Sequence, residues 1–160
     1  MKRIILYVYQ SIDGCPISAD KELDAAINSS HCVLTDEETY LRIFLNHLGW
    51  SIQSKDTFVV SDKRINPMEA GRVFPSKADD VRKMKDEGSG VMIAYGEEIG
   101  ALLLNHELVD EIVVTVTPQF VGGDEKALSC GLSDGKRWHI KSNDLLANGR
   151  VRTVYKMRNN

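Results

Sequence analysis

The main candidate for chemistry in this sequence is Asp13, in the segment Ser11-Ile12-Asp13-Gly14. The segment follows Arg3 to Gln10, a run of β-branched and aromatic residues that is typical of a strand buried on both faces. A carboxylate in this position could act on a bound substrate. The alternative is that Asp13-Gly14 is only a turn, in which the aspartate hydrogen-bonds to its own backbone.

Neither the histidines nor the cysteines indicate a metal site. The four histidines are scattered, with no pair at metal-ligand spacing: His31, His47, His106 and His139. The three cysteines are widely spaced, odd in number and free of any CxxC pair: Cys15, Cys32 and Cys130. A reduced, cytoplasmic compartment is therefore expected, and no metal.

Length and composition predict one soluble domain that spans residues 1–160. Hydrophobic residues make up 42% of the chain and charged residues 27%, and the net charge is −3. This charge gives no electrostatic footprint for nucleic acid. No apolar run approaches the roughly 18 residues that span a bilayer, so no membrane role is expected.

Strand-like and helical segments alternate along the chain. The expected strands are short apolar runs, at Arg3 to Gln10, His31 to Leu34, Phe58 to Val60, Val91 to Ala94 and Ile112 to Val116. The expected helices begin at a Thr35-x-x-Glu38 capping box, cover Asp79 to Glu87, and follow the Tyr95-Gly96 turn.

This alternation predicts a three-layer α/β fold. The central sheet is expected to be mostly parallel, with helices on both faces. Asn148-Gly149 is a hairpin signal ahead of Arg150 to Lys156, so the sheet should end in an antiparallel C-terminal hairpin. In such sheets ligands bind beyond the carboxyl ends of the strands, where helices begin.

Four segments, in order along the chain, resemble the dihydrofolate-reductase-like family. They are most similar to the reductase domain of the bifunctional riboflavin-biosynthesis deaminase–reductase and its stand-alone bacterial relatives. The segments are Ser11 to Gly14, Val33 to Tyr40, Met92 to Ile99, and Leu102 to Asp124 with its Leu108-Val109-Asp110-Glu111 and Val121-Gly122-Gly123 pieces. The resemblance implies a dihydrofolate-reductase-like fold and a homodimer.

The resemblance also implies an NADPH site and a substrate site. Helix starts at Asp36 to Thr39 and Gly96 to Ile99 would receive phosphates, because free backbone N–H groups and the helix dipole favour anions there. The implied cofactor-binding residues are Thr39, Ser61, Lys63, Gly96, Glu97 and Ile99. The implied substrate site holds Asp13 as the catalytic residue, with Ser11 and Gly14 as binding residues.

The chain departs from the family pattern at both helix starts. Asp36 and Glu37 stand where the family has Gly and Arg, and Glu97-Glu98 replaces a Gly- or Ser-rich pair. Two like charges about 5 Å apart repel by roughly 3 kcal/mol at an effective dielectric near 20, so these carboxylates would weaken phosphate binding. For Glu37 and Glu98, whose side chains could point outward, the alternative is that they only complement the helix dipoles, at about 0.3–1 kcal/mol each. Asp36 and Glu97 replace residues that let the backbone approach a phosphate, so this alternative explains them less well.

Two functions follow from this pattern. The first is an NADPH-dependent reductase of a small pyrimidine- or pterin-like heterocycle. The second is a non-catalytic relative with a degenerate cofactor site, which acts as a small-molecule binder or a dimeric scaffold. A phosphorylated substrate would need basic residues, and between Ser11 and His31 the chain offers only Lys21.

Overall fold

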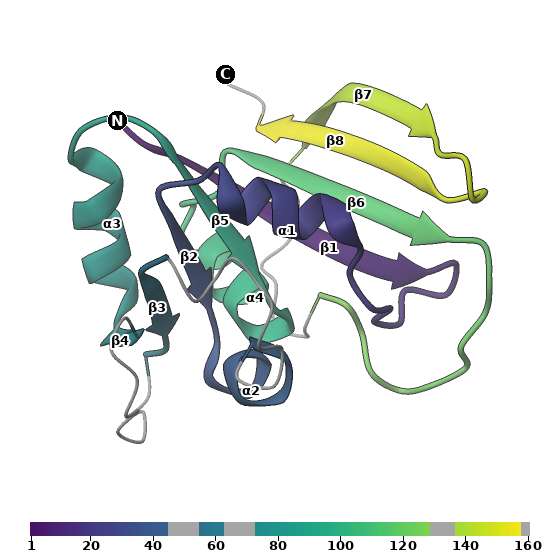
Figure 1. The fold of residues 1–160 in the computed structure, drawn as a ribbon, viewed down its shortest axis with the longest axis horizontal. Helices are drawn as coiled ribbons and strands as arrows, with labels where there is room; N and C mark the ends of the chain where they lie inside the picture. Colours follow the sequence, from purple (N-terminus) through teal and green to yellow (C-terminus); the bar gives the residue numbers. More distant parts are fainter. Residues whose placement is uncertain (45–54, 63–72, 129–136, 158–160) are drawn as a thin grey trace.

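One sheet contains every strand that the computed structural model describes, over residues 1–44, 55–62, 73–128 and 137–157. These residues form eight strands in the order β4-β3-β2-β5-β1-β6-β8-β7 (Figure 1). The strands are β1 (Arg3–Ser11), β2 (Cys32–Thr35), β3 (Thr57–Val60), β4 (Val73–Ser76), β5 (Val91–Tyr95), β6 (Glu111–Thr117), β7 (Trp138–Leu145) and β8 (Val151–Met157). The helices are α1 (Lys21–Asn28), α2 (Glu37–Thr39) with its π-helical continuation η1 (Tyr40–Phe44), α3 (Ala78–Asp86) and α4 (Glu97–Asn105).

The sheet is parallel from β4 through β6, and it ends in an antiparallel hairpin. Each neighbouring pair from β4 to β6 is parallel. β8 then runs antiparallel to β6, and β7 antiparallel to β8. The predicted mostly parallel sheet with a C-terminal hairpin is therefore confirmed.

Side chains of the central strand β1 alternate between two cores, one on each face of the sheet. Ile4, Leu6 and Val8 belong to the first core, together with Val81 of α3 and Ile99 and Leu103 of α4. Ile5, Tyr7 and Tyr9 belong to or pack against the second core, with Leu23 and Ile27 of α1. The nearly continuous apolar sequence of β1 has this cause, since both of its faces are covered.

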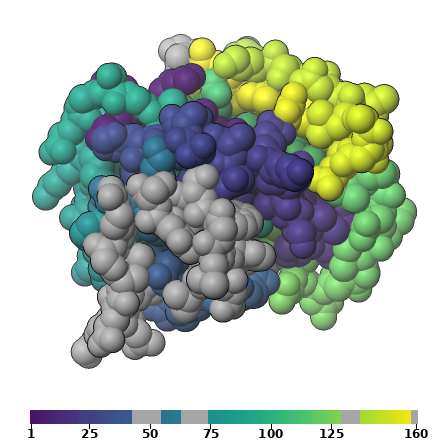
Figure 2. Space-filling view, in the orientation of Figure 1, coloured from purple at the N-terminus to yellow at the C-terminus, as the bar shows by residue number. Residues whose placement is uncertain are grey.

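Ion pairs join the start of α1 to the start of β8 on the second face. Asp20, the N-cap of α1, lies 2.9 Å from Arg150, and Glu22 in its first turn lies 2.7 Å from Arg152. Figure 2 shows the result, with α1 across the front of the molecule and the yellow hairpin beside it. The acidic start of α1 therefore fixes the position of the helix as well as complementing its dipole.

The sequence did not indicate β4, and it left the place of Ile112–Val116 open. β4 contains Pro75, which cannot donate to a strand ladder and is tolerated here because β4 lies at the sheet edge. Ile112–Val116 forms most of β6, which is an interior strand between β1 and β8. Among the described strands, β7 is the last in the sheet at the C-terminal side, and the homodimer stays a prediction.

A buried lysine joins α3 to the start of the sheet. Lys85, 8% exposed, donates from Nζ to the Leu108 carbonyl oxygen at 2.9 Å and to the Asp110 carboxylate. Asp110 Oδ2 in turn accepts from the backbone N–H of Ile4 at 2.8 Å. The pair therefore satisfies backbone groups of two segments that the helix covers.

We predict that Lys85→Met lowers the free energy of unfolding by about 2 kcal/mol. Breaking a fully buried pair costs more, but the Asp110 side chain is 32% exposed, so water screens part of the loss. The measurement is urea unfolding. Lys83→Met is the matched control, because Lys83 is exposed on the same helix and its loss should change stability by about 0.5 kcal/mol or less. Equal losses in both variants would contradict this role for Lys85.

Candidate functional site

The candidate site lies where the parallel strands β1 and β5 part. Their last paired residues are Tyr7 and Tyr95, after which β5 ends. β1 continues to Ser11, paired on its other side with β6. Beyond the end of β5, the chain after β1 folds back on it, and Ile17 donates its backbone N–H to the Tyr9 carbonyl oxygen at 3.0 Å. A space therefore opens at the carboxyl ends of the strands, between the β5–α4 turn on one side and β1 with the segment that follows it on the other.

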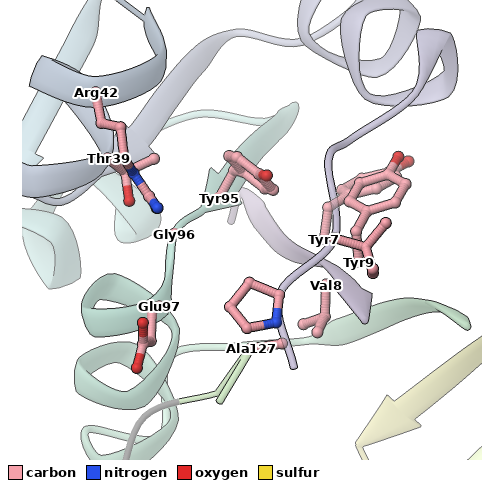
Figure 3. Close-up of a pocket in the computed structure, with 11 residues that line it drawn as sticks. Tyr7, Val8, Tyr9, Thr39, Arg42, Tyr95, Gly96, Glu97 and Ala127 are labelled. Carbon is pink, nitrogen blue, oxygen red and sulfur yellow. The ribbon is translucent and has the colours of Figure 1, made fainter. Parts of the chain in front are cut away.

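This space is a pocket of about 380 Å³, a volume that includes its open mouth (Figure 3). Its walls come from β1, the segment after β1, the α2–η1 region and the β5–α4 turn. The lining residues are Tyr7, Val8, Tyr9, Pro16, Ile17, Thr39, Arg42, Tyr95, Gly96, Glu97 and Ala127. The pocket thus combines aromatic and aliphatic walls with a few polar groups, as small-molecule sites do.

The tyrosines give the pocket uncharged aromatic surfaces. The rings of Tyr9 and Tyr95 meet edge to face, with centroids 6.1 Å apart. Burial raises the pKa of Tyr7 to about 12 and also raises the pKa of Tyr95. Burial, followed by the nearby Asp20 carboxylate, raises the pKa of Tyr9, whose hydroxyl donates to Asp20 at 2.9 Å. These phenols therefore stay protonated and uncharged at neutral pH.

The carboxylate of Asp36 joins the starts of two helices. Its Oδ1 accepts from the Thr39 N–H at 2.7 Å, which makes Asp36 the N-cap of α2. Its Oδ2 accepts from the Ile99 N–H at 3.0 Å, in the first turn of α4. The predicted capping box at Thr35 is therefore wrong by one residue. Thr35 ends β2, and its hydroxyl donates instead to the Tyr95 carbonyl oxygen at 2.9 Å, across the sheet.

Gly96 lies directly against this carboxylate. Its φ of 139° falls in a region that favours glycine. A Cβ atom at this position would lie 2.7 Å from Thr39 Oγ1 and still closer to Asp36 Oδ2. The close approach that only glycine permits is therefore made here to a side chain of the protein itself.

Glu97 brings a carboxylate to the wall of the pocket. Its side chain is half-buried, and other carboxylates lie around it. Burial, and then the charges of Glu125, Glu38, Asp36 and Glu98, raise the pKa of Glu97. The negative charge on Glu97 is therefore unfavourable in the folded protein.

Of the predicted cofactor residues, Thr39, Gly96 and Glu97 line the pocket together. Ile99 contributes its backbone N–H, but to Asp36. Ser61 follows β3, where its N–H donates to the Ser76 carbonyl oxygen at 3.0 Å, and it is not a lining residue. Lys63 lies outside the described residues.

The predicted substrate residues form a clamp beside the pocket. The Asp13 carboxylate accepts from the Ser11 hydroxyl and from the backbone N–H groups of Val121 and Gly122, the latter two at 3.1 and 2.8 Å. Gly14, with φ of 81°, accepts from the Ala127 N–H at 2.9 Å. These contacts join the turn after β1 to the segment after β6, which supplies Ala127 to the pocket. The catalytic role of Asp13 stays a prediction.

The sequence reasoning missed the tyrosines and Arg42. In Figure 3 the Arg42 side chain extends from the α2–η1 region toward Gly96. Tyr7 and Tyr9 carried one usable signal, because alternate residues of a strand share a face. The point where β5 stops, which exposes them to a pocket, depends on tertiary structure.

In the part of the chain that the structure describes, no three His, Cys, Asp or Glu side chains are placed so that they could hold a metal ion. In the same residues, no helix combines the length and the apolar character needed to cross a membrane.

The strand order and the antiparallel C-terminal hairpin define the fold class of this chain. The chain has the dihydrofolate-reductase-like fold, as the sequence resemblance predicted. No protein-family model matches the sequence, and neither does any curated protein. Solved structures do match the structure of this chain. The sequence identities of those described next are below 20%, so the likeness establishes the fold alone.

Three of these structures illustrate the likeness. A Shewanella sp. PV-4 protein named for riboflavin biosynthesis has a TM-score of 0.81 at 18% identity, over 98% of this chain and 99% of its own. A diaminohydroxyphosphoribosylaminopyrimidine deaminase/5-amino-6-(5-phosphoribosylamino)uracil reductase from Thermotoga maritima has a TM-score of 0.65 at 13% identity, over 98% of this chain and 56% of its own. Dihydrofolate reductase from Enterococcus faecalis, complexed with NADP(H) and RAB-propyl, has a TM-score of 0.71 at 12% identity, over 98% and 97%.

We predict that Asp13→Asn destabilises the protein near neutral pH and that the difference becomes progressively smaller as the pH falls below about 4. The Ser11 hydroxyl, followed by the Gly122 and Val121 N–H groups, holds the pKa of Asp13 well below its usual range. The stability linked to this ionised carboxylate is present above its ordinary pKa of 3.8 and is lost as the pH falls below that value. Thermal midpoints from pH 7 down to pH 2.5 or so test this linkage.

Asp124→Asn is the control for this clamp, because Asp124 is exposed on the same segment. A constant difference between wild type and Asp13→Asn at all pH values would count against an ionised clamp.

We predict the opposite pH dependence for Glu97→Gln. Because the pKa of Glu97 is raised in the folded state, its ionised form destabilises the fold, and the glutamine variant should have the higher thermal midpoint at pH 7. As the pH falls toward the ordinary value of 4.5, the wild-type carboxyl group takes up its proton and the two midpoints should converge. Glu98→Gln, an exposed change in the same helical turn, should have the smaller effect. A lower midpoint for Glu97→Gln at pH 7 would refute this assignment.

Proposed function

We propose that this protein is a reductase of a small heterocyclic substrate, pyrimidine- or pterin-like, which binds in the pocket between β1 and β5. The proposal draws support from the fold and from the named reductases that share it. Fold alone does not fix an activity, so the pocket carries the argument.

The observation that carries the proposal is the chemistry of the pocket walls. Tyr9 and Tyr95 are largely buried, at 3% and 9% exposed, and contribute aromatic surface to the wall that would face a bound ring. Arg42 and Glu97 add one cation and one carboxylate to the lining, and Thr39 adds a hydroxyl group. A planar ring with donors and acceptors on its edge matches this combination of apolar faces and a few polar groups.

A nicotinamide dinucleotide fits this site only in part. Thr39 and Gly96 are present at the two helix starts, as the resemblance requires. The Ile99 N–H, which a phosphate oxygen would use, donates to Asp36 instead, and the Asp36 carboxylate fills the space against Gly96. The residues at this turn therefore do not fit a pyrophosphate group as they stand, and we assign no reaction step to NADPH.

This misfit favours a second candidate, a non-catalytic small-molecule binder or dimeric scaffold that retains the fold and the pocket. The two candidates differ in one measurable property, because a reductase of this kind needs a nicotinamide dinucleotide and a binder does not.

We expect NADPH or NADH to bind if the reductase proposal holds. Nicotinamide fluorescence and the thermal midpoint are followed during titration of each dinucleotide. A ligand at about 100 times its Kd stabilises the folded state by about 2.7 kcal/mol. Saturable binding at micromolar concentrations supports the reductase, and no response to either dinucleotide at millimolar concentrations rejects it in favour of the binder.

Arg42→Gln and Arg82→Gln form a matched pair for this titration. Arg42 lines the pocket, so its loss should weaken the binding of a dinucleotide whose ring enters the pocket about tenfold, as expected for a hydrogen bond from a charged group. Arg82 is exposed on α3, where its guanidinium donates to the His106 carbonyl oxygen, and its loss should leave affinity unchanged. Equal effects of both variants would place the ligand outside this pocket.

A further inference from the structure

At the start of α4, the position that a bound anion would occupy is filled by the carboxylate of Asp36. Both carboxylate oxygens of Asp36 are used, one on the Thr39 N–H and one on the Ile99 N–H. The residue is only 2% exposed, so this carboxylate is enclosed and has left bulk water. A buried carboxylate that accepts two backbone N–H groups is held far more firmly than a surface charge.

The start of a helix attracts negative charge, because its first N–H groups have no partner within the helix. In α4 the Ile99 N–H already has a partner, the carboxylate of Asp36. The Gly96 backbone, which comes nearest to this point, leaves no room for even a methyl group beside the carboxylate and Thr39. An external phosphate oxygen could reach the Ile99 N–H only if the Asp36 side chain left.

The charges around this point also oppose a phosphate group. Glu97 and Glu98 lie in the first turn of α4, and Glu37 and Glu38 in the first turn of α2. Among the described residues that line the pocket, Arg42 is the one cation, and Glu97 is a carboxylate in the same lining. Between Ser11 and His31, which includes the Pro16–Ile17 wall, the sequence provides one further cation, Lys21.

We propose that Asp36 is a specificity-determining residue, which restricts the pocket to a ring-shaped ligand that brings no phosphate group to the Gly96 turn. The ligand class is an unphosphorylated heterocycle or nucleoside. The proposal deepens the proposed function by naming the chemistry of the ligand in the same pocket. It does not require that the protein turn over a substrate.

The test replaces Asp36 by serine and uses inorganic pyrophosphate as the probe. Serine is a good N-cap, so Asp36→Ser keeps an acceptor for Thr39 while it removes the charge and frees the Ile99 N–H. We expect Asp36→Ser to bind pyrophosphate at least about tenfold more tightly than wild type, the size of one charge-assisted hydrogen bond. Calorimetric titration gives the affinity, and the amide resonance of Ile99 should move on titration in the variant and stay fixed in wild type.

Two further variants keep the test decisive. Asp36→Gly removes both the charge and the side chain, glycine is also tolerated as an N-cap, and this variant replaces Asp36→Ser if the serine variant fails to fold. Glu98→Gln is the matched control, because it removes a charge from the same helical turn without freeing the Ile99 N–H. A gain in Glu98→Gln equal to that in the Asp36 variants would overturn the proposal, and so would tight pyrophosphate binding by wild type that shifts the Ile99 resonance. A folded Asp36 variant with no gain would also overturn it.

The outcomes separate this proposal from the reductase. Wild type that binds NADPH at micromolar concentrations, with an affinity that the Asp36 variants do not change, keeps the reductase and removes the role of Asp36. If wild type binds neither NADPH nor NADH while Asp36→Ser gains affinity for pyrophosphate, the reductase proposal is rejected and the role of Asp36 is supported.

Discussion

The structure depends on the unequal lengths of the two central parallel strands. β1 and β5 are buried on both faces, so their side chains supply both cores and fix which helices cover which side. They pair only as far as Tyr7 and Tyr95, while β1 stays paired with β6 up to Ser11. The chain must leave β5 sideways at Gly96, and the space that this departure opens beside β1 is the pocket. Core and pocket therefore arise from the same pair of strands.

The two polar clusters beside the pocket have different structural tasks. Asp36 holds the α2 and α4 starts together on one side, and Asp13 holds the segment after β6 to the turn after β1 on the other. Each carboxylate binds backbone N–H groups from a segment distant in sequence. A carboxylate can accept several such bonds at once, which makes it a suitable group for joining two loops. Both residues also stand at positions where the sequence resemblance implies ligand chemistry, so structure and function make competing demands on the same side chains.

The sequence predicted the sheet well because its central strands are continuous apolar runs, and such runs form strands wherever both faces can be covered. β4 was not predicted, because it is four residues long and contains Pro75, and only its edge position makes it acceptable. The α2 cap was placed at Thr35 because Thr and Asp are both good caps. Tertiary structure decided between them, since the Thr35 hydroxyl is used on Tyr95 across the sheet. The composition of the pocket could not be predicted, because it depends on where β5 stops rather than on any local pattern.

The acidic residues at the two helix starts do not all have the same role, although the sequence pattern alone does not distinguish them. For Glu98, which is exposed in the first turn of α4, the dipole-complement interpretation suffices. For Asp36 it does not, because the residue is buried and its second oxygen reaches another helix. From the sequence alone, these carboxylates are expected to repel a phosphate at a distance, with the anion site itself left open. In the folded protein the stronger effect is direct occupation, since a carboxylate that already accepts the Ile99 N–H excludes a phosphate oxygen by contact as well as by charge. The Ile99 N–H at the Gly96 turn is therefore already used within the protein, and the other lining residues of the pocket do not depend on it.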